Sequence, residues 1–564
     1  MDKLNLSVPK PRVESQGAAE VRPRRIREWL DELPLANHAE AARQIRQALY
    51  ALNRVDLDPD NRLEVMELYR GPATEVGEGL FRGVDMLGLP LSERAGERVD
   101  AARAIEAELA TGYKLVVRDA SRRAGRSLRN EAHAMALARA MEYLGRELID
   151  AYDVYRPAPQ RVWRELHTLY RIAEGQKLLN VPLDARSEQP TTAARTYQRV
   201  LLVGACNPYG MSQGDIRRVD EFLRVRGARA QIGTDTAIQD PAGQFLVNLL
   251  SDSAPVPFPR GREVPPQDHL RVLSVIELVR DVHGLLKSLE GGESPEAFGL
   301  SQARVDGAYL DLLRRMGKFW GLSIRRQSNR SVRADSVSLC IGLGSAHFFL
   351  EGGDPALPAA PEAPAGHSAR YVDLDGLPAE PEAVQDTVSR DKAPAARVIR
   401  SDIWEARDEY VVYQWQTHDE SAGGLALERR GEFETTVRVG ELAGIEDPIQ
   451  GMWRVGVIRW TRSEGPDQVE MGVQLLGPEA YAVSLREEAE AGVAQHPWSG
   501  AVLFSANVRL QRPETLVAPR GAFRIGMALT MRDSAGGQVR VKPVQVVERT
   551  GTFEQFVFVR SAGE

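Results

Sequence analysis

Three arginines, Arg325, Arg326 and Arg330, stand close together in the segment RRQSNR of a chain whose formal net charge is −7 at pH 7. The planar guanidinium fork of arginine matches phosphate oxygens and the O6 and N7 acceptors of guanine, and its plane stacks on bases. A charge-assisted contact from arginine to phosphate is roughly twice as strong as a neutral hydrogen bond. Arg326 and Arg330 therefore have the chemistry of a clamp for phosphate and a stacking surface for a base, with Arg325 as an optional further contact.

A second polar group lies in the segment DESAGG, which runs from Asp419 to Gly424. The carboxylate of Asp419 can accept from the N1–H and N2–H₂ edge of guanine, and the hydroxyl of Ser421 can bond a base or a phosphate. Gly423 and Gly424 would let the backbone approach a ligand without a Cβ in the way.

Each group also has a purely structural interpretation. The arginines could form a solvated basic linker, and DESAGG could be a hairpin turn in which Asp419 bonds its own backbone. The similar segment DSAGG, Asp533 to Gly537, follows no arginine pair, and we interpret it as a turn alone.

The two groups can meet if two strands pair. The apolar run over residues 337–350 predicts a strand that begins a few residues after Arg330, and DEYVVYQWQ predicts a strand that ends just before HDESAGG. Antiparallel pairing would bring Arg326 and Arg330 beside Asp419, Ser421 and Gly424, with the intervening segment at the far end of the hairpin. Lengthening that connection from about ten to about sixty residues costs only on the order of 1.6 kcal/mol.

The pattern R-x-x-x-R followed by D-x-S-x-x-G resembles the signature of PilZ domains, six-stranded β-barrels that bind the bacterial second messenger cyclic di-GMP. The later segments MWRVGVIRWTR and VEMGVQLLG resemble the two closing strands of that barrel. The resemblance covers about residues 322 to 486, less the intervening segment. It implies that cyclic di-GMP is the ligand and that its contacts are Arg325, Arg326, Arg330, Asp419, Ser421, Gly423 and Gly424.

The sequence around this region divides into a helical part and a strand-rich part. Up to about residue 320 apolar residues recur at helical spacing, as Val162, Leu166, Leu169 and Ala173 do, and we count roughly nine to eleven such helices. We therefore expect a flexible N-terminus over residues 1–24 and an all-α domain over residues 25–320, which includes a helix in the segment DHLRVLSVIELVRDVHGLLKSL.

After about residue 335 the apolar period changes to two, which predicts strands. We expect the PilZ-like barrel over residues 321–350 and 400–490, and a small all-β domain over residues 495–562. The intervening residues 351–399 are rich in Ala, Pro, Glu and Asp, and should be largely disordered because they carry too little apolar surface to offset ordering entropy. The predicted fold class is thus multidomain α + β, with a barrel interrupted by a disordered insert.

Composition excludes several classes of function. With 43% hydrophobic and 27% charged residues the chain is of an ordinary globular kind, and its negative charge argues against a general grip on nucleic acid or anionic lipid. Cys206 and Cys340 are too few for a disulfide framework or a thiolate metal site. The spacing of Cys340, His347 and His418 matches no metal-ligand pattern. No export signal and no run of about 18 apolar residues is visible, so we expect a cytoplasmic protein without a membrane span.

We therefore predict a bacterial effector without catalytic residues, cofactor or metal, in which cyclic di-GMP binding changes how the helical domain contacts an unknown protein partner. The alternative is a PilZ-like scaffold or adaptor that does not bind nucleotide. An RNA-binding barrel is a third possibility, which the negative charge and the lack of interleaved basic and aromatic residues weaken.

Overall fold

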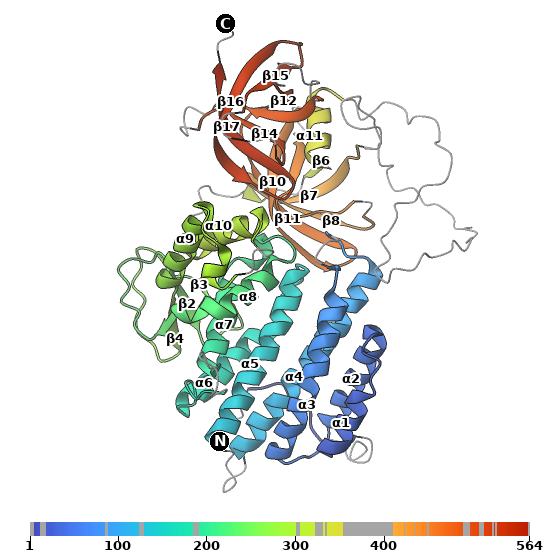
Figure 1. Cartoon of the computed structure of the whole chain (residues 1–564), viewed down its shortest axis with the longest axis vertical. Coiled ribbons are helices and arrows are strands. Elements are labelled where there is room, and N and C mark those ends of the chain that lie inside the picture. Colours follow the sequence, from blue (N-terminus) through green and yellow to red (C-terminus); the bar gives the residue numbers. More distant parts are fainter. Residues whose placement is uncertain are drawn as a thin grey trace, which may run out of the picture. The chain divides into compact units, whose positions relative to one another are not determined.

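The structure is a computed structural model, and it divides the chain into two compact units (Figure 1). The first unit comprises residues 1–325, 432–436 and 462–467, and the second comprises residues 326–431, 437–461 and 468–564. Within these units the structure describes residues 5–11, 19–84, 88–122, 129–183, 191–300, 305–321, 331–332, 335–353, 410–421, 423–433, 435–447, 451–488, 497–506, 512–521, 524 and 527–561.

The first unit begins with a bundle of α-helices, as the apolar spacing predicts. The long helices α4 and α5 lie side by side, and α3 packs on α4 (Figure 1). The spacing of Val162, Leu166, Leu169 and Ala173 is confirmed, because all four side chains are buried on one face of α6. The helices are α1 (Pro23–Asp31), α2 (His38–Leu52), α3 (Pro59–Phe81), α4 (Glu93–Arg122), α5 (Asn130–Asp153), α6 (Val162–Gly175), α7 (Ala193–Ala205) and α8 (Asp215–Arg226).

A small antiparallel sheet follows the bundle, and the sequence prediction missed it. Its strands are β1 (Gln231–Gly233), β2 (Gln244–Asn248), β3 (Val256–Pro257) and β4 (Leu270–Ser274), in the order β1-β4-β2-β3. The segment predicted as one helix is therefore strand β4 followed by helix α9 (Ile276–Glu290), with α10 (Gly307–Gly321) after it. Residues 270–273 of β4 are all buried, so this strand lacks the alternation that would have distinguished it from the helix that follows.

The second unit contains the six-stranded barrel that the motifs predict. The strands close in the order β7-β6-β9-β10-β11-β8, with β8 pairing back to β7, and the short β5 (Ser331–Val332) also pairs with β7. The two predicted closing strands are confirmed as the neighbours β10 and β11. The barrel strands are β6 (Ser336–Ile341), β7 (Tyr413–Ser421), β8 (Gly424–Arg430), β9 (Leu442–Glu446), β10 (Trp453–Gly465) and β11 (Gln468–Leu475).

The apolar run over residues 337–350 is only partly a strand. β6 ends at Ile341, Gly342 takes a positive φ of 96°, and residues 343–350 form helix α11 (Leu343–Leu350). The long-strand prediction was wrong there because a helix buried against two partners is as continuously apolar as a buried strand. The ring of Phe348 in α11 stacks on Tyr410, with ring centroids 4.9 Å apart, so α11 is tied to the chain just before β7.

A second six-stranded barrel ends the chain, closed in the order β12-β13-β14-β17-β16-β15. Its first strand, β12, pairs with β13 and β15, so this barrel begins before the boundary that we expected at residues 490–495. The predicted turn at Asp533 to Gly537 is confirmed: Gly537 N–H donates to Asp533 Oδ1 at 2.7 Å. The strands are β12 (Ala480–Glu487), β13 (Ser499–Phe504), β14 (Thr515–Pro519), β15 (Leu529–Asp533), β16 (Gln538–Arg549) and β17 (Phe553–Ser561).

The two barrels share one hydrophobic core. Ala346 of α11 and Val455 and Val457 of β10 pack in a single buried cluster with Phe504 and Phe553 of the C-terminal barrel. His347, fully buried in α11, lies with its Nε2 3.0 Å from the carbonyl oxygen of Val483 in β12. The outer face of the first barrel at β9 and β10 is therefore covered by α11 and the second barrel rather than by solvent.

Two further sequence expectations can be compared with the part of the chain that the structure describes. Cys206 and Cys340 are both buried free thiols, one in each unit. No described helix is long and apolar enough to cross a bilayer.

A buried histidine fixes the packing of α6 in the helical unit. His167 is fully buried, with Nδ1 2.7 Å from the hydroxyl of Tyr197 and Nε2 3.1 Å from the carbonyl oxygen of Ser253. A neutral ring that accepts from the hydroxyl and donates to the carbonyl satisfies both contacts. Burial lowers the pKa of His167 to about 4.

This lowered pKa predicts acid sensitivity of the helical unit. Neutral His167 makes its full stabilising contribution above its unfolded pKa of about 6.5. As the pH falls towards about 4 this contribution is lost, and the total loss is on the order of 3 kcal/mol. Urea unfolding of the wild type and of His167→Gln, between pH 7.5 and 4.5, measures it. As the pH is lowered, we expect the free energy of unfolding to decrease less in the variant than in the wild type. Parallel plots of this free energy against pH would contradict a neutral, buried His167.

Candidate functional site

The strand pairing that the site requires is present. β6 and β7 are antiparallel, with Ser336 opposite Gln416, as predicted. β5 adds a second stretch beside β7, with Ser331 opposite Glu420 and Val332 opposite Asp419. Ser331 directly follows the second arginine of the R-x-x-x-R motif in the sequence.

The arginines Arg325, Arg326 and Arg330 themselves lie outside the described residues. What the structure describes is the backbone on either side of the junction, where β5 starts and β7 ends. Paired strands are about 4.8 Å apart, so the chain leaving the arginine motif runs beside the D-x-S segment.

Asp419 and Ser421 belong to β7, which continues five residues past the end that we predicted at Gln416. Ser421 pairs with Gly424 of β8, and Gly423 lies in the turn between the two strands. The Ser421 hydroxyl donates to the carbonyl oxygen of Gly424 at 3.2 Å. The segment DESAGG is thus the end of a strand, a tight turn and the start of the next strand.

A β-bulge at His418 sets the direction of the motif side chains. Thr417 lies opposite Leu427, but Asp419 lies opposite Ala426, so β7 has one residue more than β8 at this point. Opposite residues in an antiparallel pair point to the same face. Asp419 therefore faces away from the barrel interior, on the opposite side from the buried Thr417 and Leu427, whereas a regular strand would have turned it inwards.

Hydrogen bonds hold the bulged residue. His418 Nε2 lies 2.8 Å from Glu428 Oε2, and the second carboxylate oxygen accepts from Arg430 Nε and Gln468 Nε2, each at 2.7 Å. Burial acts to raise the pKa of Glu428, but the hydrogen bonds from Arg430 and His418 outweigh it and hold the pKa below its usual value. His418 is thus part of a surface ion-pair network, and the described residues contain no cluster of three metal-ligating side chains.

The two motif glycines have different surroundings. A Cβ at Gly424 would lie 2.2 Å from the carbonyl oxygen of Val473 in β11, which is backbone and cannot move aside cheaply. A Cβ at Gly423 would meet nothing within 4 Å. Close packing of β8 on β11 explains the glycine at 424, while position 423 leaves open space at the turn.

This contrast predicts different costs for two neighbouring substitutions. Gly424→Ala should lower the free energy of unfolding by about 1–3 kcal/mol or more, because it overpacks a strand pair. Gly423→Ala should stay within about 0.5 kcal/mol of the wild type. Urea denaturation followed by circular dichroism compares the two, and equal losses would show that the close contact with Val473 is not the constraint.

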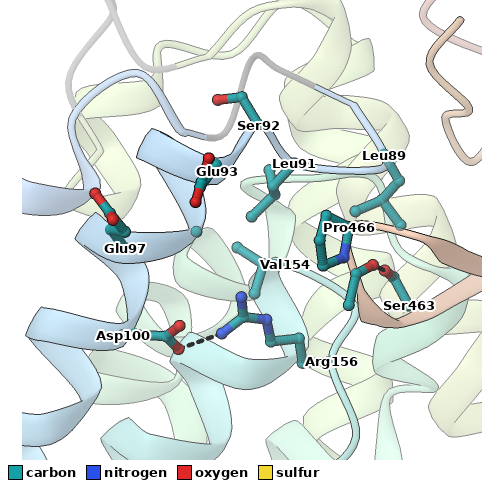
Figure 2. A pocket seen from close by; sticks show the side chains of 12 residues that line it. Leu89, Leu91, Ser92, Glu93, Glu97, Asp100, Val154, Arg156, Ser463 and Pro466 are labelled. Atoms are coloured by element: carbon teal, nitrogen blue, oxygen red, sulfur yellow. Dashed lines mark hydrogen bonds and ion pairs between the residues drawn. The ribbon is translucent and has the colours of Figure 1, made fainter. Parts of the chain in front are cut away.

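A separate cavity of about 200 Å³ lies in the first unit (Figure 2). Arg156 forms an ion pair with Asp100 at its wall, and Ser463 N–H donates to the carbonyl oxygen of Tyr155 at 3.0 Å. Three carboxylates of α4 line this cavity, so its negative electrostatic potential disfavours the binding of phosphates. Its lining residues are Leu89, Leu91, Ser92, Glu93, Gly96, Glu97, Asp100, Val154, Arg156, Ser463, Gly465 and Pro466.

Sequence reasoning missed two features of the site region: the bulge at His418 and an ion pair between Glu420 and Arg454. The bulge leaves no signal in the apolar pattern. Arg454 did leave one, because it stands in WRVGVI at the alternate phase from Val455 and Val457, and so on the face opposite theirs.

Comparison with known proteins finds similarity along nearly the whole chain. Three family models match in order: "Cyclic-di-GMP receptor FimW, N-terminal domain" over residues 24–236, "Cyclic-di-GMP receptor FimW, middle PilZ domain" over residues 244–481, and "FimW C-terminal beta-barrel domain" over residues 494–561. The cyclic-di-GMP receptor FimW of Pseudomonas aeruginosa is 29% identical over 598 aligned residues, which cover 99% of this chain and 94% of that protein. No solved structure matches.

Proposed function

Because this chain belongs to the cyclic-di-GMP receptor FimW family, with an N-terminal domain, a middle PilZ domain and a C-terminal β-barrel domain, we propose that it binds cyclic di-GMP itself. The proposed contacts are the arginines that precede β5 and the outer face of the β7–β8 hairpin. The observation that carries the proposal is the pairing of Ser331 with Glu420, which sets the residue that follows the R-x-x-x-R motif beside the D-x-S segment.

Each contact has a defined chemical role in this proposal. Arg326 and Arg330 clamp the phosphates and stack on guanine, and Arg325 adds a further guanidinium. Asp419 accepts from the Watson–Crick edge of guanine, and Ser421 bonds a base or a phosphate. Gly423 and Gly424 bring backbone to the ligand, and the open space at Gly423 suits that role.

The family name describes a receptor, so we propose binding rather than catalysis as the activity. In this proposal the nucleotide shifts the population of conformations of the chain near residues 325–330, and the helical domain then contacts a protein partner differently. We place this effector in the cytoplasm, without a cofactor and without nucleic-acid polymers as partners. The rival is a scaffold in which the same barrel only mediates protein contacts.

Isothermal titration of cyclic di-GMP into the full chain tests the proposal. We expect wild-type binding at micromolar or tighter affinity, because each good base contact supplies about 1–3 kcal/mol. Arg326→Ala, Arg330→Ala and Asp419→Ala should each weaken binding by tenfold or more. Asp533→Ala is the matched control, because it changes the same residue type in the similar DSAGG turn of the other barrel.

The outcomes separate the two functions. Binding that the motif variants lose and Asp533→Ala keeps supports the receptor, with GTP and cyclic AMP as ligands that should give no heat. No binding to the wild type leaves the scaffold. A pocket that also reads guanine edges should lose less affinity between 50 and 200 mM salt than adventitious polyanion binding, which falls steeply with salt.

A further inference from the structure

The residue between Asp419 and Ser421 is a carboxylate that faces the barrel interior. Glu420 lies opposite Leu425 of β8, and Leu425 lies opposite Val473 of β11. Both apolar residues are buried, and they continue the face of Leu427. Since opposite residues share a face, Glu420 projects from β7 towards this apolar interior, where an unpaired carboxylate would be costly.

One partner of Glu420 comes from the far wall of the barrel. Arg454 on β10 lies opposite Ile445 of β9, which lies opposite Leu339 of β6, so these three side chains share the interior face. The side chains of Val455 and Val457, which lie on the same strand as Arg454, point the other way, into the core shared with the C-terminal barrel. Arg454 Nη1 and Nη2 lie 3.2 and 3.3 Å from Glu420 Oε1.

This ion pair crosses the barrel rather than following the sheet. β7 and β10 are not neighbours in the strand order, because β6 and β9 separate them on one side and β8 and β11 on the other. The side chains are 24% and 20% exposed, so the pair sits where the interior opens near the β7–β8 turn. A partly buried, charge-assisted contact of this kind restrains both strands more than a surface pair would.

The pair also distinguishes two registers of β7. A one-residue slip exchanges the two faces of a strand. Without the bulge at His418, Asp419 and Ser421 would turn into the interior and Glu420 would turn out, away from Arg454. The ion pair with Arg454 exists only in the bulged register, which is the register that turns Asp419 and Ser421 outwards.

We propose that Arg454 is a positioning residue for cyclic di-GMP binding: by holding Glu420 at the barrel opening, it keeps the flanking Asp419 and Ser421 on the outer face. Arg454 acts from inside the barrel and does not touch the ligand. This inference rests on the proposed function, since it names a residue on which the same site depends.

The test is isothermal titration of cyclic di-GMP into the full chain and two variants. Arg454→Ala should weaken binding about tenfold or more, which corresponds to about 1.4 kcal/mol. Arg459→Ala is the matched control, because Arg459 lies on the same strand and forms an ion pair with Glu548 of the C-terminal barrel. It should bind within about twofold of the wild type.

Two further measurements separate positioning from a general loss of structure. Hydrogen exchange should rise in the β7–β8 hairpin of Arg454→Ala and stay unchanged there in Arg459→Ala. The charge reversal Arg454→Glu should abolish binding, and adding Glu420→Arg should restore it at least in part, because the pair is rebuilt with its ends exchanged. If Arg454→Ala does not fold, the double charge reversal still tests the positioning role.

The outcomes also distinguish the two proposals. If the wild type does not bind cyclic di-GMP, the proposed function fails and the positioning role fails with it. If the wild type binds but Arg454→Ala binds equally well, or the double reversal restores nothing, the positioning role alone is overturned.

Discussion

The extra residue at His418 is the constraint on which the candidate site depends. Up to Thr417, β7 alternates regularly between the barrel interior and the outside, and the bulge then reverses the phase. Every polar side chain of the D-x-S segment takes its direction from that reversal. The ion pair of Glu420 with Arg454 inside and the hydrogen bond of His418 with Glu428 outside favour the same arrangement from both faces of the strand.

The barrel that carries the site is not an isolated module. β10 contributes to the interior through Arg454 and to the shared core through Val455 and Val457, so one strand belongs to two packing environments. Helix α11 joins them further, through the contact of His347 with Val483. Close packing of this kind transmits displacements, because a packed core has few intermediate arrangements. The C-terminal barrel thus supports the wall opposite the candidate site.

Much of the fold follows from patterns that the sequence displays. The helical spacing of Val162 to Ala173 and the two-residue period of β11 each predict the correct element, and the paired motifs predict the barrel and its hairpin. The failures share a cause. Strand β4 and helix α11 are buried on several sides, so neither shows the polar face that identifies an element from its period. The bulge at His418 depends on the partner strand, and no local pattern encodes it. The positions of the three arginines stay a prediction.

The contact between Phe348 and Tyr410 fastens the two ends of the long connection between α11 and β7. Tyr410, where the described chain resumes, also packs in a buried cluster with Cys340 and Phe349, so both described ends of the connection are held at one place. The length of the connection therefore has little effect on the stability of the barrel, because the loop-closure cost grows only with the logarithm of that length. A reporter domain inserted between Gly353 and Tyr410 would therefore add little loop-closure cost, while the contact of Phe348 with Tyr410 still holds the two described ends together.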